Sequence, residues 1–283
     1  MHQYILTISC PDQIGIVAAV TTFIAQQKGM IVQSHQHGEP TTNTFFMRVV
    51  IDADNLEITE AKFNELFQPI AEPFNMEWKF EDTNIKKRVA ILASKQNHCL
   101  VDLLHRWQSK ELDCDIVCVI SNHIEAQELA LWHDIPFHYV NFTESDNQNA
   151  FATVDQILTE ATVDVIVLAR FMRIMPGQLC KKYFGKMINI HHSFLPAFTG
   201  ANPYQQAFEK GVKLIGATCH YVTEELDQGP IIEQGIARIH HGHTPNDMKR
   251  LGRDVEKIVL ANGLRYHLNS QIIIHQNKTV VFE

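Results

Sequence analysis

The segment KMINIHHSFLPAF, residues 186–198, decides how the rest of the chain is interpreted. Its first five residues are mostly apolar and predict the end of a buried strand. An amide, two imidazoles and a hydroxyl then follow within five positions, and Pro196 cannot join the hydrogen-bonded ladder of a sheet. Asn189 and His191 are two residues apart, so a strand would direct both side chains to one side. We therefore predict a polar site where this strand leaves its sheet.

The sequence around this segment, residues 88–283, predicts a doubly wound, mostly parallel α/β domain. Short and nearly continuous apolar runs are typical of strands covered on both faces, and segments with helical spacing separate them. These runs are VAILAS (89–94), DIVCVIS (115–121), VDVIVLA (163–169) and KMINI (186–190). In such a domain ligands bind at the carboxyl ends of the strands, where the opening segment lies.

The N-terminal part, residues 1–82, has a different pattern. Strand-like segments at 3–10, 30–37, 43–52 and 74–80 are interrupted by two segments of helical spacing. The order βαββαβ predicts a ferredoxin-like α+β domain with two helices on one face of its sheet. The charged stretch 83–87 is the expected linker to residues 88–283.

Composition excludes several classes of function. The net charge of −8 and the lack of a basic patch argue against a nucleic-acid partner. No apolar run approaches the roughly 20 residues that cross a bilayer, so we expect no membrane partner. The first residues carry no secretory signal and the six cysteines are scattered without a CxxC pair, so we expect a cytoplasmic protein.

Four polar residues form the candidate site: Asn189, His191, Ser193 and Asp227. Asp227 lies in LDQGPI, just before another predicted strand, so it can meet the end of the strand that carries Asn189 and His191. Each of these residues alone has a structural explanation, as a cap, a hydrogen bonder or a turn former. Together they place an amide donor, a titratable base and a carboxylate around one point. Ser193 is expected to cap the loop, since no base–acid relay leads to it.

The motif HHGH at 240–243 is the one candidate for a metal site. No carboxylate accompanies these histidines at a fixed spacing, and a long amphipathic helix follows at once. We therefore expect no metal.

The segment NIHHSFLPAFTGANPYQQAFEKGVKLIGATCHYVTEELDQGPII, residues 189–232, resembles the signature of the folate-dependent formyltransferase superfamily. ARFMRIM (169–175) also matches, as the loop around the pterin ring. The resemblance covers roughly residues 88–283 and implies that Asn189, His191 and Asp227 are catalytic. It assigns substrate-binding positions to Leu168, Arg173, Ile174, Met175, Thr218, His220, Val222 and Glu224. The implied formyl donor, 10-formyltetrahydrofolate, is a substrate, and no separate cofactor is expected.

Residues 1–82 resemble an ACT domain, a module that senses amino acids. Asp12 and Gly15 occupy the turn where that family binds its effector. An ACT domain followed by a formyltransferase-like domain resembles the arrangement of the formyltetrahydrofolate deformylase family. This resemblance implies hydrolysis of 10-formyltetrahydrofolate, an amino-acid effector and a homo-oligomer that pairs ACT sheets.

Two alternatives remain open: a formyltransferase with an unusual amine acceptor, and an inactive amino-acid-responsive regulator. Related transferases hold a phosphorylated acceptor with a glycine-rich loop, but the matching stretch, residues 92–104, contains no glycine. Thr199 stands where those transferases carry a basic residue. Both departures favour hydrolysis over transfer. An intact set of catalytic residues argues against an inactive regulator.

Overall fold

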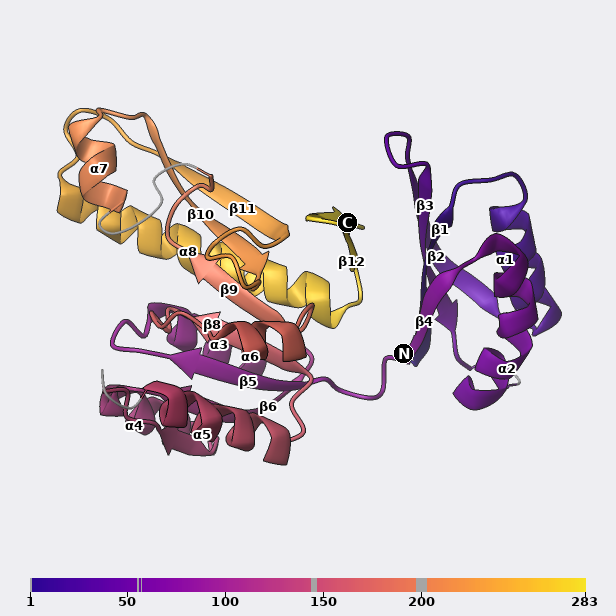
Figure 1. The fold of residues 1–283 in the computed structure, drawn as a ribbon, viewed down its shortest axis with the longest axis horizontal. Helices are drawn as coiled ribbons and strands as arrows, with labels where there is room; N and C mark the ends of the chain where they lie inside the picture. Colours follow the sequence, from indigo (N-terminus) through magenta and orange to yellow (C-terminus); the bar gives the residue numbers. More distant parts are fainter. Residues whose placement is uncertain (1, 55, 57, 144–146, 197–202) are drawn as a thin grey trace. The chain divides into compact units, whose positions relative to one another are not determined.

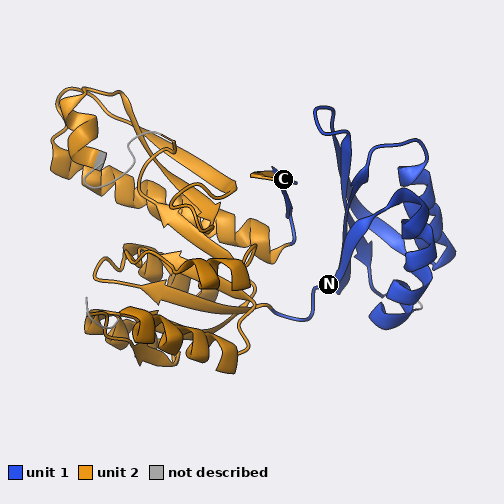
Figure 2. Cartoon of the chain, viewed as in Figure 1, with its two compact units in different colours: residues 1–86, 270–275, 280–283 blue, residues 87–269, 276–279 orange. Residues whose placement is uncertain are grey.

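The computed structural model describes residues 2–283 except 55, 57, 144–146 and 197–202. The chain forms two compact units (Figure 2). Unit 1 comprises Met1–Lys86, Ser270–His275 and Val280–Glu283, and unit 2 comprises Lys87–Asn269 and Gln276–Thr279. Thr199, whose neighbourhood was compared with that of transferases, lies outside the described residues.

Unit 1 has the predicted ferredoxin-like order. Its elements are β1 (Gln3–Pro11), α1 (Ile16–Gln26), β2 (Met30–Glu39), β3 (Thr44–Asp52), α2 (Glu60–Ala71), η1 (Glu72–Phe74) and β4 (Glu77–Asp82). The strands pair in the antiparallel order β2-β3-β1-β4. Apolar side chains of α1 and α2, such as Phe23 and Phe63, pack on one face of this sheet and form a closed core.

The C-terminal segments of unit 1 contact the β2–β3 part of its sheet. The Arg48 guanidinium on β3 is 5% exposed and donates to the Ser270 carbonyl at 3.1 Å. The His275 ring lies 5.1 Å from the ring of buried Phe46, in an edge-on arrangement. Ser270 lies just before, and His275 at the end of, the strand β12 (Ile272–His275), which pairs with β13 (Lys278–Val281) in a hairpin.

Unit 2 is the predicted α/β domain (Figure 1). Its strands are β5 (Arg88–Ala93), β6 (Asp115–Ser121), β7 (Phe137–Tyr139), β8 (Val165–Ala169), β9 (Met187–His191), β10 (Leu214–Tyr221) and β11 (Ile231–Arg238). They pair in the order β11-β10-β9-β8-β5-β6-β7. The five strands from β9 to β7 are parallel, whereas β10 and β11 are antiparallel to their neighbours.

Helices cover this sheet and bury its apolar strands. They are α3 (His98–Gln108), η2 (Ile124–Ala126), α4 (Gln127–Trp132), α5 (Asn147–Glu160), α6 (Gly177–Lys182), α7 (Pro203–Glu209) and α8 (Pro245–Leu268). Helix α5 packs Phe151 and Val154 into the core formed with β5, β6 and β8. Helix α8 packs against α3 and against β9, β10 and β11. Within the described part of the chain, no helix has both the length and the hydrophobicity needed to cross a bilayer.

The strand order brings the carboxyl ends of β5, β8 and β9 together, since these strands are adjacent and parallel. The loops that leave these three ends begin near Ser94, Arg170 and His192. The Ser94 hydroxyl donates to the Arg170 carbonyl and so joins two of these loops. This edge of the sheet holds the candidate site, as the general behaviour of open α/β sheets predicts.

Candidate active site

The polar residues of the opening segment lie at the end of β9. The antiparallel neighbour β10 places Thr218 opposite His191 and His220 opposite Asn189. Side chains of paired residues point to the same face of a sheet, so these four form one polar column in an otherwise apolar interior. Among them, His191, Thr218 and His220 are buried.

Asp227 reaches this column from the loop between β10 and β11. Its Oδ2 lies 3.2 Å from Nδ1 of His191, and its Oδ1 lies 3.7 Å from Nε2 of His220. Its backbone is left-handed, with φ of 56°, which a residue other than glycine adopts only at a cost. Burial raises the pKa of the Asp227 carboxyl, but the hydrogen bond from His191 and the nearby imidazole of His220 outweigh burial and hold that pKa well below its ordinary value. The carboxyl is therefore an anion at neutral pH.

His220 determines how the Asn189 amide is oriented. Its Nδ1 lies 2.9 Å from the Tyr221 carbonyl oxygen, which can only accept, so Nδ1 carries the proton. In the neutral ring Nε2 is then an acceptor, and the Asn189 Nδ2 lies 3.1 Å from it. One Asn189 N–H is thereby used, and the other is left for a ligand.

His191 has one ring nitrogen without a protein partner. Nδ1 donates to Asp227, whereas the buried Nε2 has no hydrogen bond to any residue that the structure describes. A buried polar atom without a partner is uncommon in native proteins. Because His191 lines a cavity, a bound ligand or water is the natural partner for Nε2.

Thr218 fixes the loop that follows β9. Its hydroxyl donates to the Ser193 carbonyl at 2.9 Å and accepts from the Leu195 N–H at 3.0 Å. The Gln234 amide donates to the same hydroxyl at 3.0 Å. Thr218 is fully buried, so its contribution is to hold the chain as it leaves the strand.

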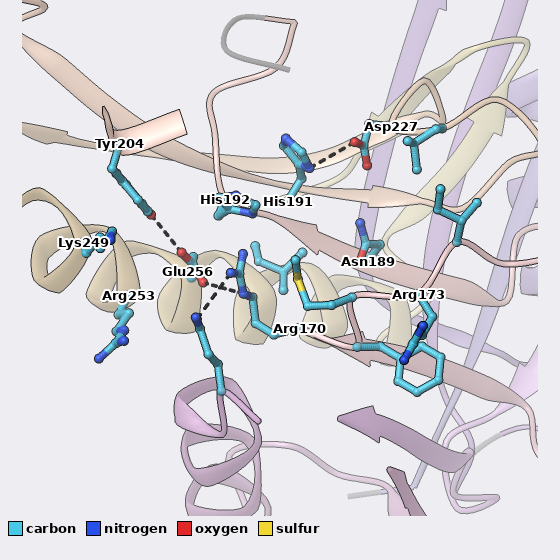
Figure 3. Close-up of a pocket in the computed structure, with 16 residues that line it drawn as sticks. Arg170, Arg173, Asn189, His191, His192, Tyr204, Asp227, Lys249, Arg253 and Glu256 are labelled. Atoms are coloured by element: carbon cyan, nitrogen blue, oxygen red, sulfur yellow. Dashed lines mark hydrogen bonds and ion pairs between the residues drawn. The ribbon is translucent and has the colours of Figure 1, made fainter. Parts of the chain in front are cut away.

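A cavity of about 600 Å³ opens beside these residues (Figure 3). Its volume suits a drug-sized ligand. Its lining residues come from the end of β9, the loops at the strand ends, α7 and α8: Gln96, Arg170, Phe171, Met172, Arg173, Ile174, Asn189, Ile190, His191, His192, Tyr204, Leu226, Asp227, Lys249, Arg253 and Glu256.

Comparison with known proteins decides the family. The Formyl transferase family model matches residues 87–264. The formyltetrahydrofolate deformylase of Bacillus subtilis (strain 168) is 44% identical over 278 residues, which cover 98% of this chain and 93% of that protein. The crystal structure of a formyltetrahydrofolate deformylase from Pseudomonas syringae pv. tomato is 53% identical and superposes with a TM-score of 0.98, covering 100% of this chain and 95% of that one.

The chain belongs to the formyltetrahydrofolate deformylase family. A phosphoribosylglycinamide formyltransferase from Anaplasma phagocytophilum is also similar, with 31% identity and a TM-score of 0.64. That similarity covers 70% of this chain and 96% of the transferase. Deformylases therefore match the chain over nearly its whole length, whereas the transferase matches a part of it.

Five of the predicted catalytic and substrate-binding residues line the large cavity, and six lie outside it. Asn189, His191, Asp227, Arg173 and Ile174 line the large cavity. The other predicted substrate-binding residues, which do not line it, are Leu168, Met175, Thr218, His220, Val222 and Glu224.

Thr218 and His220 belong to the polar column described above, and the other four residues lie elsewhere. Leu168 and Met175 lie in the apolar core, and Val222 packs against that core. Glu224 forms an ion pair with Lys181 at 3.2 Å and lines a neighbouring cavity of about 450 Å³.

A second polar cluster at the large cavity is absent from the residues predicted from sequence. Glu256 on α8 is 1% exposed and accepts from Tyr204 Oη at 2.8 Å. Its other oxygen lies 2.8 Å from His98 Nε2 and 3.5 Å from Arg170 Nε. A sequence signal for it existed, because Glu256 lies four residues after Gly252 and three before Val259, on the buried face of an amphipathic helix.

The HHGH segment forms a local turn. The Gly242 N–H donates to His240 Nδ1 at 3.1 Å, and the His240 N–H donates to His243 Nδ1 at 3.0 Å. These contacts use ring nitrogens that a metal ion would need. The expectation of no metal stays a prediction.

The predicted effector residues lie in unit 1, between β1 and α1. The Asp12 N–H donates to the Asn43 carbonyl at 2.9 Å, and the Asp12 side chain is exposed. Gly15 precedes α1 with φ of 100°, a conformation that glycine adopts without the steric cost of a Cβ.

Proposed function

We propose that the protein hydrolyses 10-formyltetrahydrofolate to formate and tetrahydrofolate, with Asn189, His191 and Asp227 as its catalytic residues. The observation that carries this proposal is the meeting of an amide, an imidazole and a carboxylate at the end of β9, beside a cavity of about 600 Å³. Membership of the deformylase family supplies the substrate class. The reaction would adjust the cell's one-carbon and purine-synthesis pools.

Asn189 and His191 stabilise the oxygen of the formyl group. That oxygen gains negative charge as water adds to the carbon. The free N–H of Asn189 and, when the ring is protonated, Nε2–H of His191 donate to it. A donor placed in this way is worth about 3–4 kcal/mol of transition-state stabilisation. His191 Nε2 has no partner in the described protein, which leaves it available for this oxygen.

Asp227 prepares both the histidine and the water. Its carboxylate lies 3.2 Å from His191 Nδ1 and accepts the hydrogen bond of that nitrogen, so it fixes the orientation of the ring. The same carboxylate orients and polarises the attacking water, or takes its proton. The released proton must finally reach N10 of the leaving folate, and we assign this transfer to His191 acting through water.

The mouth of the cavity suits the pterin ring. Met172, Ile174 and Leu226 line it and are 63%, 68% and 59% exposed. Exposed apolar side chains at a cavity are typical of a site for a flat aromatic ligand. Backbone groups of Arg173, Ile174 and Met175 would bind the polar edge of the ring.

The remaining predicted substrate-binding residues do not line the large cavity and would support the residues that do. Leu168, Met175 and Val222 would support them from the core, and Thr218 and His220 would hold the strand ends. Glu224 would act from the neighbouring cavity.

A direct assay tests the proposal against both alternatives. Purified protein is incubated with 10-formyltetrahydrofolate and no amine, and formate and tetrahydrofolate are measured together. We expect equal amounts of the two products. Formate that forms only after an amine is added would indicate a transferase, and no turnover under either condition would indicate a regulator without activity.

We further propose that unit 1 binds an amino acid near Asp12 and Gly15 and that the chain forms a homo-oligomer. The exposed Asp12 carboxylate and the backbone at Gly15 offer groups for an ammonium and a carboxylate. The ten-residue strand β2 is an edge strand, and such strands pair readily with another chain. Sedimentation and activity with each amino acid test this: a monomer whose rate no amino acid changes contradicts it.

We also propose a cytoplasmic location. All six cysteines are free and buried, as is usual in a reducing compartment. Separating the cytoplasmic from the other fractions of a cell that expresses the protein, and detecting it by antibody, tests this location.

A further inference from the structure

The proposed hydrolysis leaves one end of the cavity without a role. Asn189, His191 and Asp227 lie at one end, whereas Arg170, Tyr204 and Glu256 lie at the other (Figure 3). A phosphoribosylglycinamide formyltransferase shares the fold, and its name states transfer to an amine. Residues of this chain must therefore select water over an amine as the nucleophile that attacks the formyl carbon.

Arg170 stands at a backbone position that favours glycine. Its φ is 63°, in the left-handed region, where glycine alone pays no steric cost. The side chain that accompanies this strained backbone is 7% exposed. Strain of this kind persists where the surrounding structure requires it, commonly at functional sites. The side chain of Arg170, and not its backbone, is therefore the feature that needs an explanation.

The guanidinium of Arg170 is held inside the cavity by two contacts. Its Nε lies 3.5 Å from Glu256 Oε2, and its Nη2 donates to Gln96 Oε1 at 3.3 Å. Its Nε and Nη1 are both buried, and neither has a hydrogen bond to the described residues, so the contact with Glu256 is an ion pair only. The group thus fills space at this end of the cavity and places a positive charge there.

Glu256 is buried and already has three partners inside the protein. Oε1 accepts from Tyr204, Oε2 faces both His98 and Arg170, and the side chain is 2% exposed. Burial raises the pKa of this carboxyl, but the His98 hydrogen bond and the Arg170 charge outweigh burial and lower it. The carboxylate is therefore ionised and neutralised within the protein, and an incoming ammonium group finds no free anion.

We propose that the Arg170–Glu256 ion pair determines specificity for water. It does so by closing to amines the end of the cavity that Arg170, Tyr204 and Glu256 line, which we call the acceptor end. Water is small enough to reach the formyl carbon beside this pair. A primary amine is larger and mostly protonated at neutral pH, so it is excluded by volume and repelled by the guanidinium, with Lys249 and Arg253 adding positive charge on the same wall. This inference rests on the proposed hydrolysis and names what selects its nucleophile.

The two competing reactions differ only in the nucleophile. In hydrolysis the water oxygen bonds to the formyl carbon, the bond from that carbon to N10 breaks, and the proton that water loses ends on N10. With an amine, its nitrogen forms the new bond, and the proton that it loses ends on N10. No oxidant, reductant or further reactant is needed in either case.

The test is the fate of a ¹³C-labelled formyl group in the presence of glycinamide, a small primary amine. Glycine adopts the left-handed backbone of residue 170 without steric cost, so we use Arg170→Gly. This variant removes the side chain from the acceptor end of the cavity and leaves the Glu256 carboxylate without its arginine partner. We expect it to raise the ratio of N-formylglycinamide to formate by about tenfold or more over wild type. Arg250→Ala is the matched control, because Arg250 lies on α8, the helix of Glu256, is 75% exposed and does not line the cavity.

Three outcomes overturn the inference. The first is a folded Arg170→Gly protein whose ratio of N-formylglycinamide to formate equals that of wild type. The second is a folded variant that has lost formate release more than tenfold, because Arg170 would then serve the reaction itself. The third is wild-type protein that formylates glycinamide or is inhibited by it, a result that needs no variant at all.

The charge-balanced variant Arg170→Gly/Glu256→Gln covers the case in which the unpaired buried carboxylate prevents folding. It should show the same rise in the ratio. If wild-type protein releases no formate in the absence of amine, the proposed function fails. If it releases formate and both variants keep the wild-type ratio, only the present inference fails.

Discussion

At the scale of single residues, Asp227 links the chemistry to stability. Its carboxylate accepts a hydrogen bond from His191 and lies close to His220, and these two imidazoles hold its pKa low against the effect of burial. The folded protein therefore binds fewer protons at this site than the unfolded chain does. Stability from Asp227 is present above the pKa of an unfolded aspartate, about 4, and is lost as the pH falls further toward the folded pKa.

Asp227→Asn tests this linkage. At pH 7 the variant should unfold about 2 kcal/mol more easily, because it loses hydrogen bonds to a charged acceptor. The difference from wild type should shrink as the pH is lowered below about 4. Urea unfolding of both proteins across this range measures it. A difference in free energy that stays constant with pH would show that Asp227 is not the titrating group.

Sequence reasoning located the Asn189, His191 and Asp227 site because strand alternation and a motif both pointed to it. The same reasoning missed Arg170, Tyr204 and Glu256. Their contacts join residues that lie 52 to 158 positions apart, such as Tyr204 with Glu256 and His98 with Glu256. Local periodicity carries no information about such pairs. A glutamate on an apolar helix face is the only trace that they leave in the sequence.

At the scale of elements, α8 combines a cap, a core face and a cavity wall. Thr244 and Asp247 form a reciprocal capping box at its start. The sequence predicted this long amphipathic helix, and in the structure its Ile258 side chain is 53% exposed. Strand β7 and the short helices α6 and α7 were not predicted, because three to seven residues are too few to show a period.

Gly252 lets the side chain of Tyr204 on α7 pack closely against α8. A Cβ at this position would lie 1.9 Å from Tyr204 Oη. Glycine to alanine in a helix normally stabilises by about 1 kcal/mol, but this contact should reverse the sign. We expect Gly252→Ala to destabilise the protein by about 1–3 kcal/mol through overpacking.

A double-mutant cycle measures this coupling. In a Tyr204→Ala background the obstacle is gone, so Gly252→Ala should become neutral or stabilising in chemical denaturation. Equal effects of Gly252→Ala in both backgrounds would mean that Tyr204 does not occupy the space above Gly252.

At the scale of the whole molecule, unit 1 is completed by residues from the end of the chain. The order βαββαβ was predictable from alternating patterns, and the sheet confirms it. The contact of Arg48 with Ser270 was not predictable, since 222 positions separate the two residues. The sequence likewise does not indicate where the apolar hairpin at 272–281 packs, and the structure places its His275 against Phe46 of β3.

Ending the chain at Asn269 should loosen unit 1. The truncation removes the Ser270 carbonyl that accepts from Arg48 Nε and the ring that packs edge-on against Phe46, for a cost of roughly 3 kcal/mol. Hydrogen–deuterium exchange should therefore speed up in β1 and β3, with β5 and β8 as internal references. A chain ending at Phe282 is the control, because Glu283 is exposed. Unchanged protection of β3 would show that the C-terminal segments do not stabilise this sheet.

The central claim is that an amide at the end of β9 stabilises the oxygen of a formyl group while water attacks its carbon. The kcat for formate release from 10-formyltetrahydrofolate by Asn189→Ala, compared with wild type, tests this most directly. We predict a loss of about 10²–10³-fold in kcat, because one oxyanion donor is removed. The KM should change little, because this donor acts on charge that develops only in the transition state. A folded variant whose kcat stays within about threefold of wild type would contradict the account.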